Sequence, residues 1–456
     1  MIKKTLSETV IKFDYCIGCG GCAYISPESF HIDFDNFGML KAFNIENNDN
    51  ETIAEICPFS NEADNEDELI KDQFTKQCKY NDSIGNYIEC YAGYVVENKY
   101  RMYGSSGGVG KWLLNKLLEL NHVDKVFQVA AAKDDIVLFD YKLYQKGENL
   151  LEGSRSAYYP ISLFSTLEYI KNHEGTYAIT ALPCFAKAIR LLTKKDQILH
   201  KRIKYVIGIV CGHLKSTAFA ENFSWQLGVR PEDLSSIEFR EKLKNRKANE
   251  KGVFVVDKYN LRTPIISSKT LIGGDWGHGF FKYKACDYCD DIVGETADVS
   301  IGDAWLQEYI HDHHGNNIVI TRNSEINDLI QSCIKSGKLN LKRISVETVI
   351  ESQSAGIRHR REGLAYRLYL RRKDNWIPKK RVNPKRISNR NRRKVYFLRE
   401  KIRDVSHSLF FEAKSELNYD IFYMGIKHYL NKYHILYSVY WKRLLLMFLT
   451  RIPVTT

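Results

Sequence analysis

Short apolar runs alternate with helix-spaced apolar positions through most of the chain after about residue 87. Residues 126–130, 177–180 and 205–210 are apolar runs of strand length. Between such runs, apolar side chains recur at three- and four-residue steps, most clearly at Val109, Trp112, Leu113, Leu117 and Leu120. The alternation of the two patterns predicts a mixed α/β (α+β) body.

Five helices are expected from this periodicity. The clearest one covers residues 109–120, with Ser105 or Ser106 as its N-cap. The others are predicted over residues 161–172, 185–193, 216–227 and 325–335.

Four cysteines in the first sixty residues have the spacing of metal-cluster ligands: Cys16, Cys19, Cys22 and Cys57. Three in series with two-residue gaps, followed later by a Cys-Pro pair, are typical of a ferredoxin-type 4Fe-4S cluster, because a glycine-bearing loop lets consecutive thiolates face one centre. The bacterial ferredoxin run normally has a further cysteine that serves a second cluster, and Ser26 stands there instead. We therefore predict a single cluster here. Zinc is the alternative, although zinc sites favour separated Cys-x2-Cys pairs.

Four later cysteines form a second candidate set: Cys184, Cys211, Cys286 and Cys289. Cys184 and Cys211 each follow a predicted strand, where the loops of an α/β sheet converge, and the last two form a Cys-x2-Cys pair. We predict that this set binds another cluster, with zinc as the main alternative. The remaining cysteines are expected to be small buried apolar side chains: Cys78, Cys90 and Cys333.

A glycine-rich loop over residues 104–110 opens the clearest helix. Its backbone amides and the positive helix end would suit a phosphate group. It lacks the Walker pattern, because Trp112 follows Lys111 where a Ser or Thr is needed, and it lacks the Rossmann spacing. A plain glycine turn is the alternative. A flavin is favoured because one-electron clusters need a two-electron partner for hydride chemistry.

The formal charge of +12 is concentrated late in the chain. Residues 358–404 contain 19 Lys and Arg against 4 Asp and Glu, a net +15, so the remainder carries −3. An argument for nucleic acid or anionic lipid therefore rests on this segment alone, and no specific nucleic acid is expected. Residues 419–449 suit a basic amphipathic helix on a membrane surface or partner, or one packed on its own domain.

Composition and length give further limits. The 456 residues suggest two or three domains. Eleven cysteines without a secretory leader indicate metal or redox ligands rather than disulfides, hence a cytoplasmic protein, with peripheral contact at the inner membrane face as an alternative. The apolar run at residues 444–449 is far shorter than the roughly 20 residues of a spanning helix.

We divide the chain into a ferredoxin-like domain (1–60), an acidic linker (61–86), a flavin and iron-sulfur α/β domain (87–357) and a basic helical appendage (358–456).

Together these motifs resemble the coenzyme F420 hydrogenase/dehydrogenase beta-subunit family over about residues 10–365. Beside the cysteines and the glycine loop, the resemblance rests on the sequence around residues 154–158, 182–184, 211–216, 239–240, 286–298 and 302–305. It implies an oxidoreductase with FAD, less readily FMN, and a 4Fe-4S cluster on the second cysteine set. The flavin positions that it implies are Arg101, Ser105, Ser106, Gly107, Gly108 and Arg155.

The chain departs from the family pattern at two places. Phe185 follows Cys184 where many members have Gln, and Cys211-Gly-His213 replaces a common Cys-His-Gly, so the substrate pocket is expected to differ. Use of the deazaflavin itself is not implied, because similar bacterial proteins occur beside polysaccharide-synthesis genes. Asp290, Asp291 and Lys187 are candidates for tuning a cluster, with solvated surface charge as the usual alternative.

The hypothesis is an iron-sulfur flavoprotein that exchanges hydride with a small organic donor or acceptor and passes single electrons to a ferredoxin-like partner. No catalytic acid or base is assigned. The first alternative is an electron-transfer subunit without a substrate of its own, and the more distant one is a metal-stabilised nucleic-acid binder. His311, His313 and His314 are expected in an exposed loop rather than a metal site.

Overall fold

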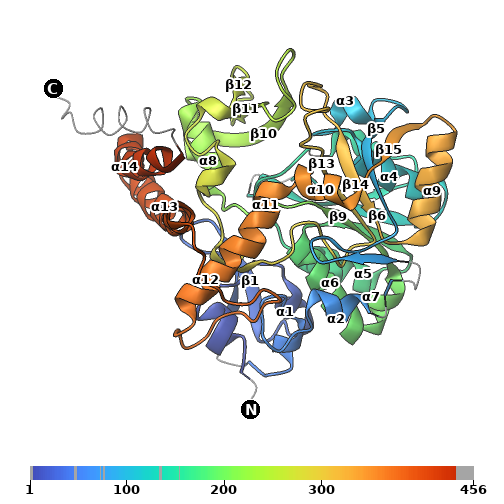
Figure 1. Cartoon of the computed structure of the whole chain (residues 1–456), viewed down its shortest axis with the longest axis horizontal. Helices are drawn as coiled ribbons and strands as arrows, with labels where there is room; N and C mark the ends of the chain where they lie inside the picture. The colour runs from blue at the N-terminus through green and yellow to red at the C-terminus, as the bar shows by residue number, and fades with distance from the viewer. Residues whose placement is uncertain are drawn as a thin grey trace.

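The computed structural model describes residues 4–45, 49–71, 73–74, 78–132, 136–153 and 155–437. Its centre is an eight-stranded sheet of order β15-β5-β14-β13-β9-β8-β6-β7 (Figure 1). In that order the strands are β15 (Leu339–Arg343), β5 (Glu89–Val95), β14 (Asn317–Thr321), β13 (Val299–Asp303), β9 (Ile203–Ile209), β8 (Tyr177–Ala181), β6 (Lys125–Ala131) and β7 (Phe139–Gln145).

The central strands β13, β9, β8 and β6 pair in parallel, whereas the outer pairs are antiparallel. The three apolar runs read from the sequence are β6, β8 and β9, which are neighbours in this sheet. The predicted mixed α/β fold is confirmed. Because β8, β9 and β13 point the same way, their carboxyl ends meet at one edge.

Helices cover both faces of the sheet, and side chains alternate along the strands to meet them. One face packs against α4 (Val109–Glu119) and α9 (Ser324–Lys335), with Tyr205 and Ile207 of β9 facing them. The other face packs against α5 (Phe164–Asn172), α6 (Pro183–Lys195) and α7 (Gln197–Arg202), and receives Val206. The helices predicted over residues 161–172, 185–193 and 325–335 are α5, α6 and α9, each within a few residues.

The predicted cap of α4 is wrong. The cap residue is Gly108, whose φ of 86° is the left-handed conformation, and a Cβ there would lie 2.5 Å from the carbonyl carbon of Tyr100. Ser106 instead donates its hydroxyl to the Asn316 carbonyl at 2.8 Å. The Asn317 side chain accepts the Val109 amide at 3.2 Å, so the helix is capped from β14, which sequence distance conceals.

The N-terminal segment shares its apolar core with the α5–α6 face of the sheet. It comprises the π-helical turn η1 (Ser7–Ile11), α1 (Gly21–Ile25), the hairpin β1 (Phe30–Phe34) and β2 (Leu40–Asn44), and the 3-10 turn η2 (Ile53–Ile56). Figure 1 shows this segment, in blue, beside α5 and α6. The predicted acidic linker contains α2 (Glu66–Ile70), β3 (Lys79–Asn81) and β4 (Gly85–Tyr87), and its Glu66 is buried.

A smaller layer lies at the carboxyl edge of the large sheet. It consists of α8 (Ala218–Gln226) and the antiparallel strands β10 (Leu234–Lys242), β11 (Lys251–Asp257) and β12 (Ile266–Ser267), whereas the nearby α3 (Tyr100–Tyr103) packs on α4 and β5. Here α8 is the helix predicted over residues 216–227. Short 3-10 turns complete the body: η3 (Leu150–Glu152), η4 (Pro231–Asp233), η5 (Ser268–Thr270), η6 (Trp276–His278) and η7 (Lys284–Tyr288).

The basic C-terminal region is largely helical and packs back on the body. It follows α10 (Val346–Ser352) and α11 (Ser354–Arg358), and comprises the π-helical turn η8 (His359–Gly363), α12 (Leu364–Arg371), α13 (Arg390–Ser415) and α14 (Tyr419–Tyr437). The apolar side of α14 is buried in a cluster with α8 and α13, which agrees with the alternative of packing on its own domain, and nothing in the described residues supports the alternative of membrane contact. Within those residues no helix is long and apolar enough to cross a bilayer, and the run at 444–449 lies outside them.

Candidate functional site

The first cysteine set lines one cavity. Cys16, Cys19, Cys22 and Cys57 surround it together with apolar side chains from η1, β1, β2 and η2. The loop that carries three of them turns through Gly18 (φ 66°) and Gly20 (φ 87°). A Cβ on Gly18 would lie 2.5 Å from the Leu40 carbonyl oxygen, so this position requires glycine. The structure thus brings the four predicted ligands around a common space.

These thiols are costly to ionise without a cation. Burial, and then the neighbouring thiols Cys16 and Cys57, raise the pKa of Cys19 and Cys22, and burial raises the pKa of Cys57 to about 12. Backbone amides of Gly18 and Ala42 reach the Cys16 sulfur at 3.4 and 3.3 Å. A bound metal centre would reverse the pKa shifts, because coordination deprotonates thiols.

The second cysteine set also lines a cavity. Cys184 lies in the first turn of α6 after β8, Cys211 follows β9, and Cys286 and Cys289 flank the end of η7. The four surround a space with Leu214, Asp291 and Arg360. Burial and then the other three thiols raise the pKa of Cys184. The convergence expected at the carboxyl ends of β8 and β9 is therefore what the structure shows.

The two sets are neighbours. Ile17, from the N-terminal cysteine loop, lines both cavities, and Phe59 beside Cys57 lines the second. Cys19 of the first set adds to the charge effects that raise the pKa of Cys184 in the second. The N-terminal segment therefore delivers its thiols directly to the wall of the second site.

Each thiol set surrounds a cavity, and a cavity between four thiols is the space that an inorganic cube requires. A single zinc ion makes a different demand, because Zn–S bonds of about 2.3 Å draw the four sulfurs of a tetrahedral site to within about 4 Å of each other.

The basic C-terminal region supplies one wall of the second site. Arg360, from η8, is 3% exposed and donates to the carbonyls of Cys286 (2.9 Å), Cys211 (3.2 Å) and Gly212 (2.7 Å). Burial by itself would lower the pKa of Arg360, but the four thiols of the second set outweigh it and raise that pKa. Sequence reasoning missed this residue, because it lies among many cations with no motif around it.

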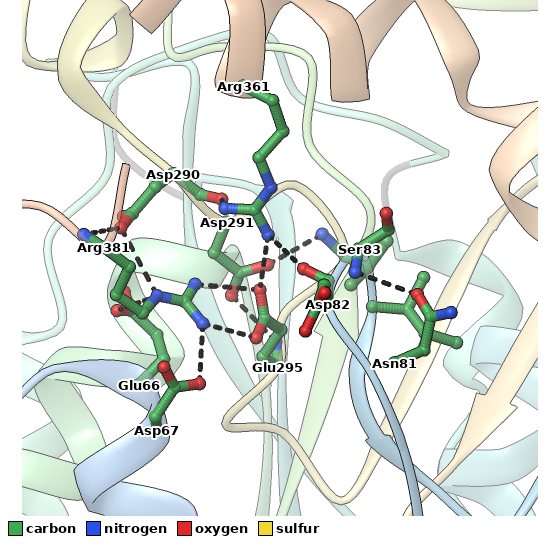
Figure 2. A network of polar contacts seen from close by, with 12 residues as sticks. Glu66, Asp67, Asn81, Asp82, Ser83, Asp290, Asp291, Glu295, Arg361 and Arg381 are labelled. Atoms are coloured by element: carbon green, nitrogen blue, oxygen red, sulfur yellow. Dashed lines mark hydrogen bonds and ion pairs between the residues drawn. The ribbon is translucent and has the colours of Figure 1, made fainter. Parts of the chain in front are cut away.

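A buried ion network holds the loop that follows Cys289. Figure 2 shows Arg381 surrounded by carboxylates from α2 and from residues 290–295. Its guanidinium contacts Glu295 at 2.7 and 2.9 Å, Asp67 at 3.0 Å, and Glu66 and Asp290 at 3.4 Å. Arg361 donates to the Asp290 and Asp82 carbonyls at 3.0 and 2.8 Å. The network therefore fixes the cysteine loop both to the segment that contains α2 and to the C-terminal region.

The charges near the second site are buried, contrary to the usual expectation of solvated ones. Asp290, Asp291 and Lys187 are at most 5% exposed. Asp290 pairs with Arg381 and Lys380, Lys187 pairs with Glu66, and the Asp291 carboxylate accepts three amides of residues 293–295 at 2.8 to 2.9 Å. The basic region contacts Asp290 and α2 contacts Lys187, and the local sequence does not reveal either contact.

The glycine-rich loop is shaped by internal packing. A Cβ on Gly107 would lie 2.6 Å from the Gly93 carbonyl oxygen, and Gly108 has no room for a side chain either. Ser106 is buried and bonded to Asn316, whereas Ser105 is half-buried. These glycines are thus explained by contacts with β5 and β14, and they do not by themselves indicate a phosphate.

Cations gather beside this loop. Arg101 pairs with Asp312, Arg155 pairs with Glu241, and Arg240 forms two bonds of 2.8 and 2.9 Å with Asp303 at the end of β13. Three lysines join these arginines and have no ion pair within the residues described: Lys111, Lys242 and Lys251. The predicted flavin residues Arg101 and Arg155 therefore lie in a larger basic cluster.

Burial disfavours the charged form of all three lysines, and Lys111 already donates to the carbonyls of Tyr103, Leu151 and Gly153. Lys242 of β10 stands opposite Lys251 of β11 in the strand register, and like charges there destabilise a hairpin. Burial and then nearby cations, Lys251 first, lower the pKa of Lys242 to about 7. Burial with neighbouring Arg155 lowers the pKa of Lys111 to about 8. An anion would relieve both effects, so this cluster fits phosphate groups. The cluster has no sequence motif, because it depends on the register of the β10–β11 hairpin.

Aromatic side chains link the basic cluster to the second cysteine set. Tyr158 lies next to Trp276, with ring centroids 4.7 Å apart, and Trp276 stacks on His213 at 4.3 Å. Burial raises the pKa of Tyr158. The nearby Arg240 lowers this pKa, and Cys211 raises it. A Cβ at Gly212 would lie 2.0 Å from the Trp276 indole nitrogen, which explains the Cys-Gly-His order of this chain.

The remaining candidates lie elsewhere. His311 and His314 are exposed and His313 is half-buried, in the loop before β14, as expected. Cys90 and Cys333 are buried, whereas Cys78 is half-buried. Ser154 of the motif at residues 154–158 lies outside the described residues.

Comparison with known proteins bears on this arrangement. The profile for the N-terminal part of coenzyme F420 hydrogenase/dehydrogenase beta subunits matches residues 90–168, and the profile for their C-terminal part matches residues 175–347. Together they cover more than half of the chain. The chain belongs to this family. Membership implies an oxidoreductase that takes part in iron-sulfur electron transfer. The first cysteine set and Arg360 lie outside the matched ranges.

A solved structure is also similar. It is a chain of the xenon-derivatised F420-reducing [NiFe] hydrogenase complex from Methanosarcina barkeri, at 15% identity and a TM-score of 0.49. The similarity covers 67% of this chain and 99% of that one, and is too weak to carry a functional argument. No curated protein matches the chain.

Proposed function

We propose that the chain is an iron-sulfur flavoprotein oxidoreductase that couples hydride exchange at a flavin to single-electron transfer through two 4Fe-4S clusters. The observation that carries the proposal is the pair of adjacent cavities, each lined by four thiols and sharing Ile17. The first cluster would be held by Cys16, Cys19, Cys22 and Cys57, and the second by Cys184, Cys211, Cys286 and Cys289.

The flavin is proposed at the basic cluster. FAD carries two phosphates, and Arg101, Arg155, Lys242 and Lys251 would offset their charge beside residues 105–108. When bound, a flavin exchanges two electrons with a hydride donor or acceptor and single electrons with a cluster. Both Arg240 of the basic cluster and Cys211 of the second cysteine set shift the pKa of Tyr158, so the cluster and the cysteine set are close to one another. This closeness supports a flavin next to that set. Two clusters that accept one electron each would together take up the two electrons of one hydride.

Anaerobic purification tests the proposal. Iron, sulfide, zinc and flavin are measured together in one preparation, with the flavin identified after acid release. About eight irons and one FAD per chain are expected. A Cys184→Ser/Cys211→Ser variant should retain about four irons, whereas Cys333→Ser, outside both sets, should retain eight. A colourless preparation that contains zinc would contradict the proposal.

A donor assay separates the enzyme from an electron-transfer subunit. The purified chain is mixed with reduced deazaflavin, nicotinamide or ferredoxin and a dye acceptor. Turnover with a hydride donor is expected of the enzyme. Inactivity with all donors, despite full iron and flavin content, would favour the subunit.

A further inference from the structure

Arg360 is a buried cation that the proposed electron transfer has not yet used. It lines the second cavity with the four thiols, and it comes from η8, beyond the residues that match the family. We propose that Arg360 sets the reduction potential of the cluster at the second cysteine set and holds it above that of the first cluster. This inference rests on the proposed function, because it requires both clusters.

The position of the guanidinium is fixed by the loops that carry the ligands. Its two terminal nitrogens donate to the carbonyls of Cys286, Cys211 and Gly212. Its Nε is buried and finds no acceptor among the described residues. A buried donor without a partner is costly, so an N–H in this wall indicates a missing acceptor. A sulfur of a bound cluster would supply one.

The charge of Arg360 is not neutralised by the protein. None of the described carboxylates forms an ion pair with it, and the charges that raise its pKa are those of the four thiols. Nearby acids have other partners. Asp287 pairs with Lys282 and Arg403 at 2.5 Å each, and Asp290 pairs with Arg381 at 3.4 Å. Asp291 lines the same cavity without an ion pair among the described residues, and three backbone amides of residues 293–295 bond to its carboxylate and offset part of its charge.

The first site has cations of a different kind. Lys41 donates to the Cys16 carbonyl at 3.1 Å but is paired with Asp14 at 2.6 Å. Lys187, which lowers the pKa of Cys57, is paired with Glu66 at 3.4 Å. Each cation near the first thiols therefore has its own carboxylate, whereas Arg360 at the second set has none in the described residues.

This difference predicts the order of reduction. Each cluster gains one electron on reduction, with no bond made or broken, so its negative charge increases by one. An unneutralised cation in a buried wall favours that increase more than a cation already paired. The second cluster should therefore accept the first electron from a chemical reductant such as dithionite.

Redox titration of the full chain, prepared without oxygen and followed by electron paramagnetic resonance, tests the inference. The Cys184→Ser/Cys211→Ser variant identifies the signal of the first cluster. In the wild type, the second cluster should titrate at the higher potential. In Arg360→Gln, its oxidised-to-reduced ratio at the wild-type midpoint should rise at least tenfold, a shift of about 59 mV to lower potential. Arg360→Lys should change this ratio less than threefold.

Controls separate charge from fold. Arg358→Gln removes an exposed cation two residues away and should leave both midpoints unchanged. An Arg360→Gln protein with full iron content and an unshifted second midpoint would overturn the inference. If that variant loses iron, the test rests on the two midpoint potentials of the wild-type protein. A midpoint potential of the second cluster below that of the first would then overturn the inference. A wild type with only about four irons would refute the proposed second cluster itself, and the role of Arg360 with it.

Discussion

At the residue scale, the first site depends on a backbone that only glycine accepts. Gly18 lies between two ligands with a positive φ, and the Leu40 carbonyl occupies the space of a Cβ. Gly21, three residues later, is in α1, where an added Cβ would make ordinary contacts of 3.4 to 3.5 Å with Ile56 and Leu192. Alanine substitutions at the two glycines therefore form a matched test and control.

Gly18→Ala should remove the first cluster selectively, because both the strained φ and the clash with Leu40 distort the ligand loop. Iron should fall from about eight to about four per chain, with the flavin retained. Gly21→Ala should keep about eight. Equal iron contents in the two variants would contradict this account of the loop.

Flavin affinity should depend on the protonation of Lys242. Its pKa is lowered to about 7 in the free protein by burial and by Lys251, Arg101, Arg155 and Arg240. A bound phosphate favours the charged lysine, so the pKa rises on binding and a proton is taken up. FAD affinity should therefore fall as pH rises from 7 to 9, by up to tenfold per pH unit.

Fluorescence titration of the flavin-free protein between pH 6 and 9 measures this dependence. Lys242→Met should bind FAD more weakly and with a flatter pH profile. An unchanged profile would exclude Lys242 as the group responsible. Lys201→Met, which removes an exposed lysine of α7 immediately before β9, serves as control.

At the element scale, the second site depends on one loop and its ion network. Residues 286–295 carry two thiols and four buried carboxylates, and two of these, Asp290 and Glu295, pair with Arg361, Lys380 and Arg381 of the C-terminal region. Removing one partner of such a network leaves a buried charge, at a cost of about 3–5 kcal/mol. The loop therefore needs the C-terminal region to keep its shape.

Glu295 should make stability depend on pH. Burial first, and then Asp291 and Glu66, raise its pKa from 4.5 to about 7 in the fold, against the opposing effect of Arg381. Because the folded pKa is the higher one, ionisation opposes folding, and the wild type should lose stability as pH rises from about 4.5 to 7. Glu295→Gln cannot ionise, so it should gain up to about 3 kcal/mol relative to the wild type across this range.

Thermal unfolding at pH 5 and pH 8, under nitrogen, measures that difference. The melting temperature of Glu295→Gln relative to the wild type should be higher at pH 8 than at pH 5. The exposed Glu51→Gln should show no such change. A difference of the opposite sign would mean that Arg381 lowers the pKa of Glu295 below its ordinary value.

The elements themselves were largely predictable, because their apolar spacing is local. The periods of three to four and the apolar runs located α4, α5, α6, α8 and α9 as well as β6, β8 and β9. The cysteine sets were predictable from spacing and from their place after strands. The cap of α4, the Lys242–Lys251 register and Arg360 were not, because each depends on contacts between segments far apart in the sequence.

At the scale of the whole molecule, the basic region is a structural part of the redox body. Three of its cations are buried against acidic loops or cysteine carbonyls, Arg360, Arg367 and Arg403, and the half-buried Arg381 pairs with Glu295. The excess of +15 in the sequence therefore overstates the charge available to a polyanion. The nucleic-acid alternative then rests on the cations of residues 358–404 that stay exposed, such as Arg371, Arg372 and Lys373.

Binding to nucleic acid should be weak and non-specific. A 20-nucleotide single strand should bind at 150 mM salt with a Kd of about 10⁻⁴–10⁻⁶ M, whatever its sequence. Fluorescence anisotropy with two unrelated sequences measures this. Nanomolar affinity for one sequence over another would restore the alternative. Truncation before residue 358 is a poor test, because it also removes Arg360.

Ile17 is the aliphatic partition between the two thiol-lined spaces. In the proposed function an electron would cross it within one folded body, so this step would need no collision and should not slow with dilution. Because the two cavities are adjacent, the two proposed clusters would also interact electrostatically. Charge placed on one raises the cost of charging its neighbour, so the pair would fill one electron at a time, and a two-electron delivery would be split before it leaves the protein.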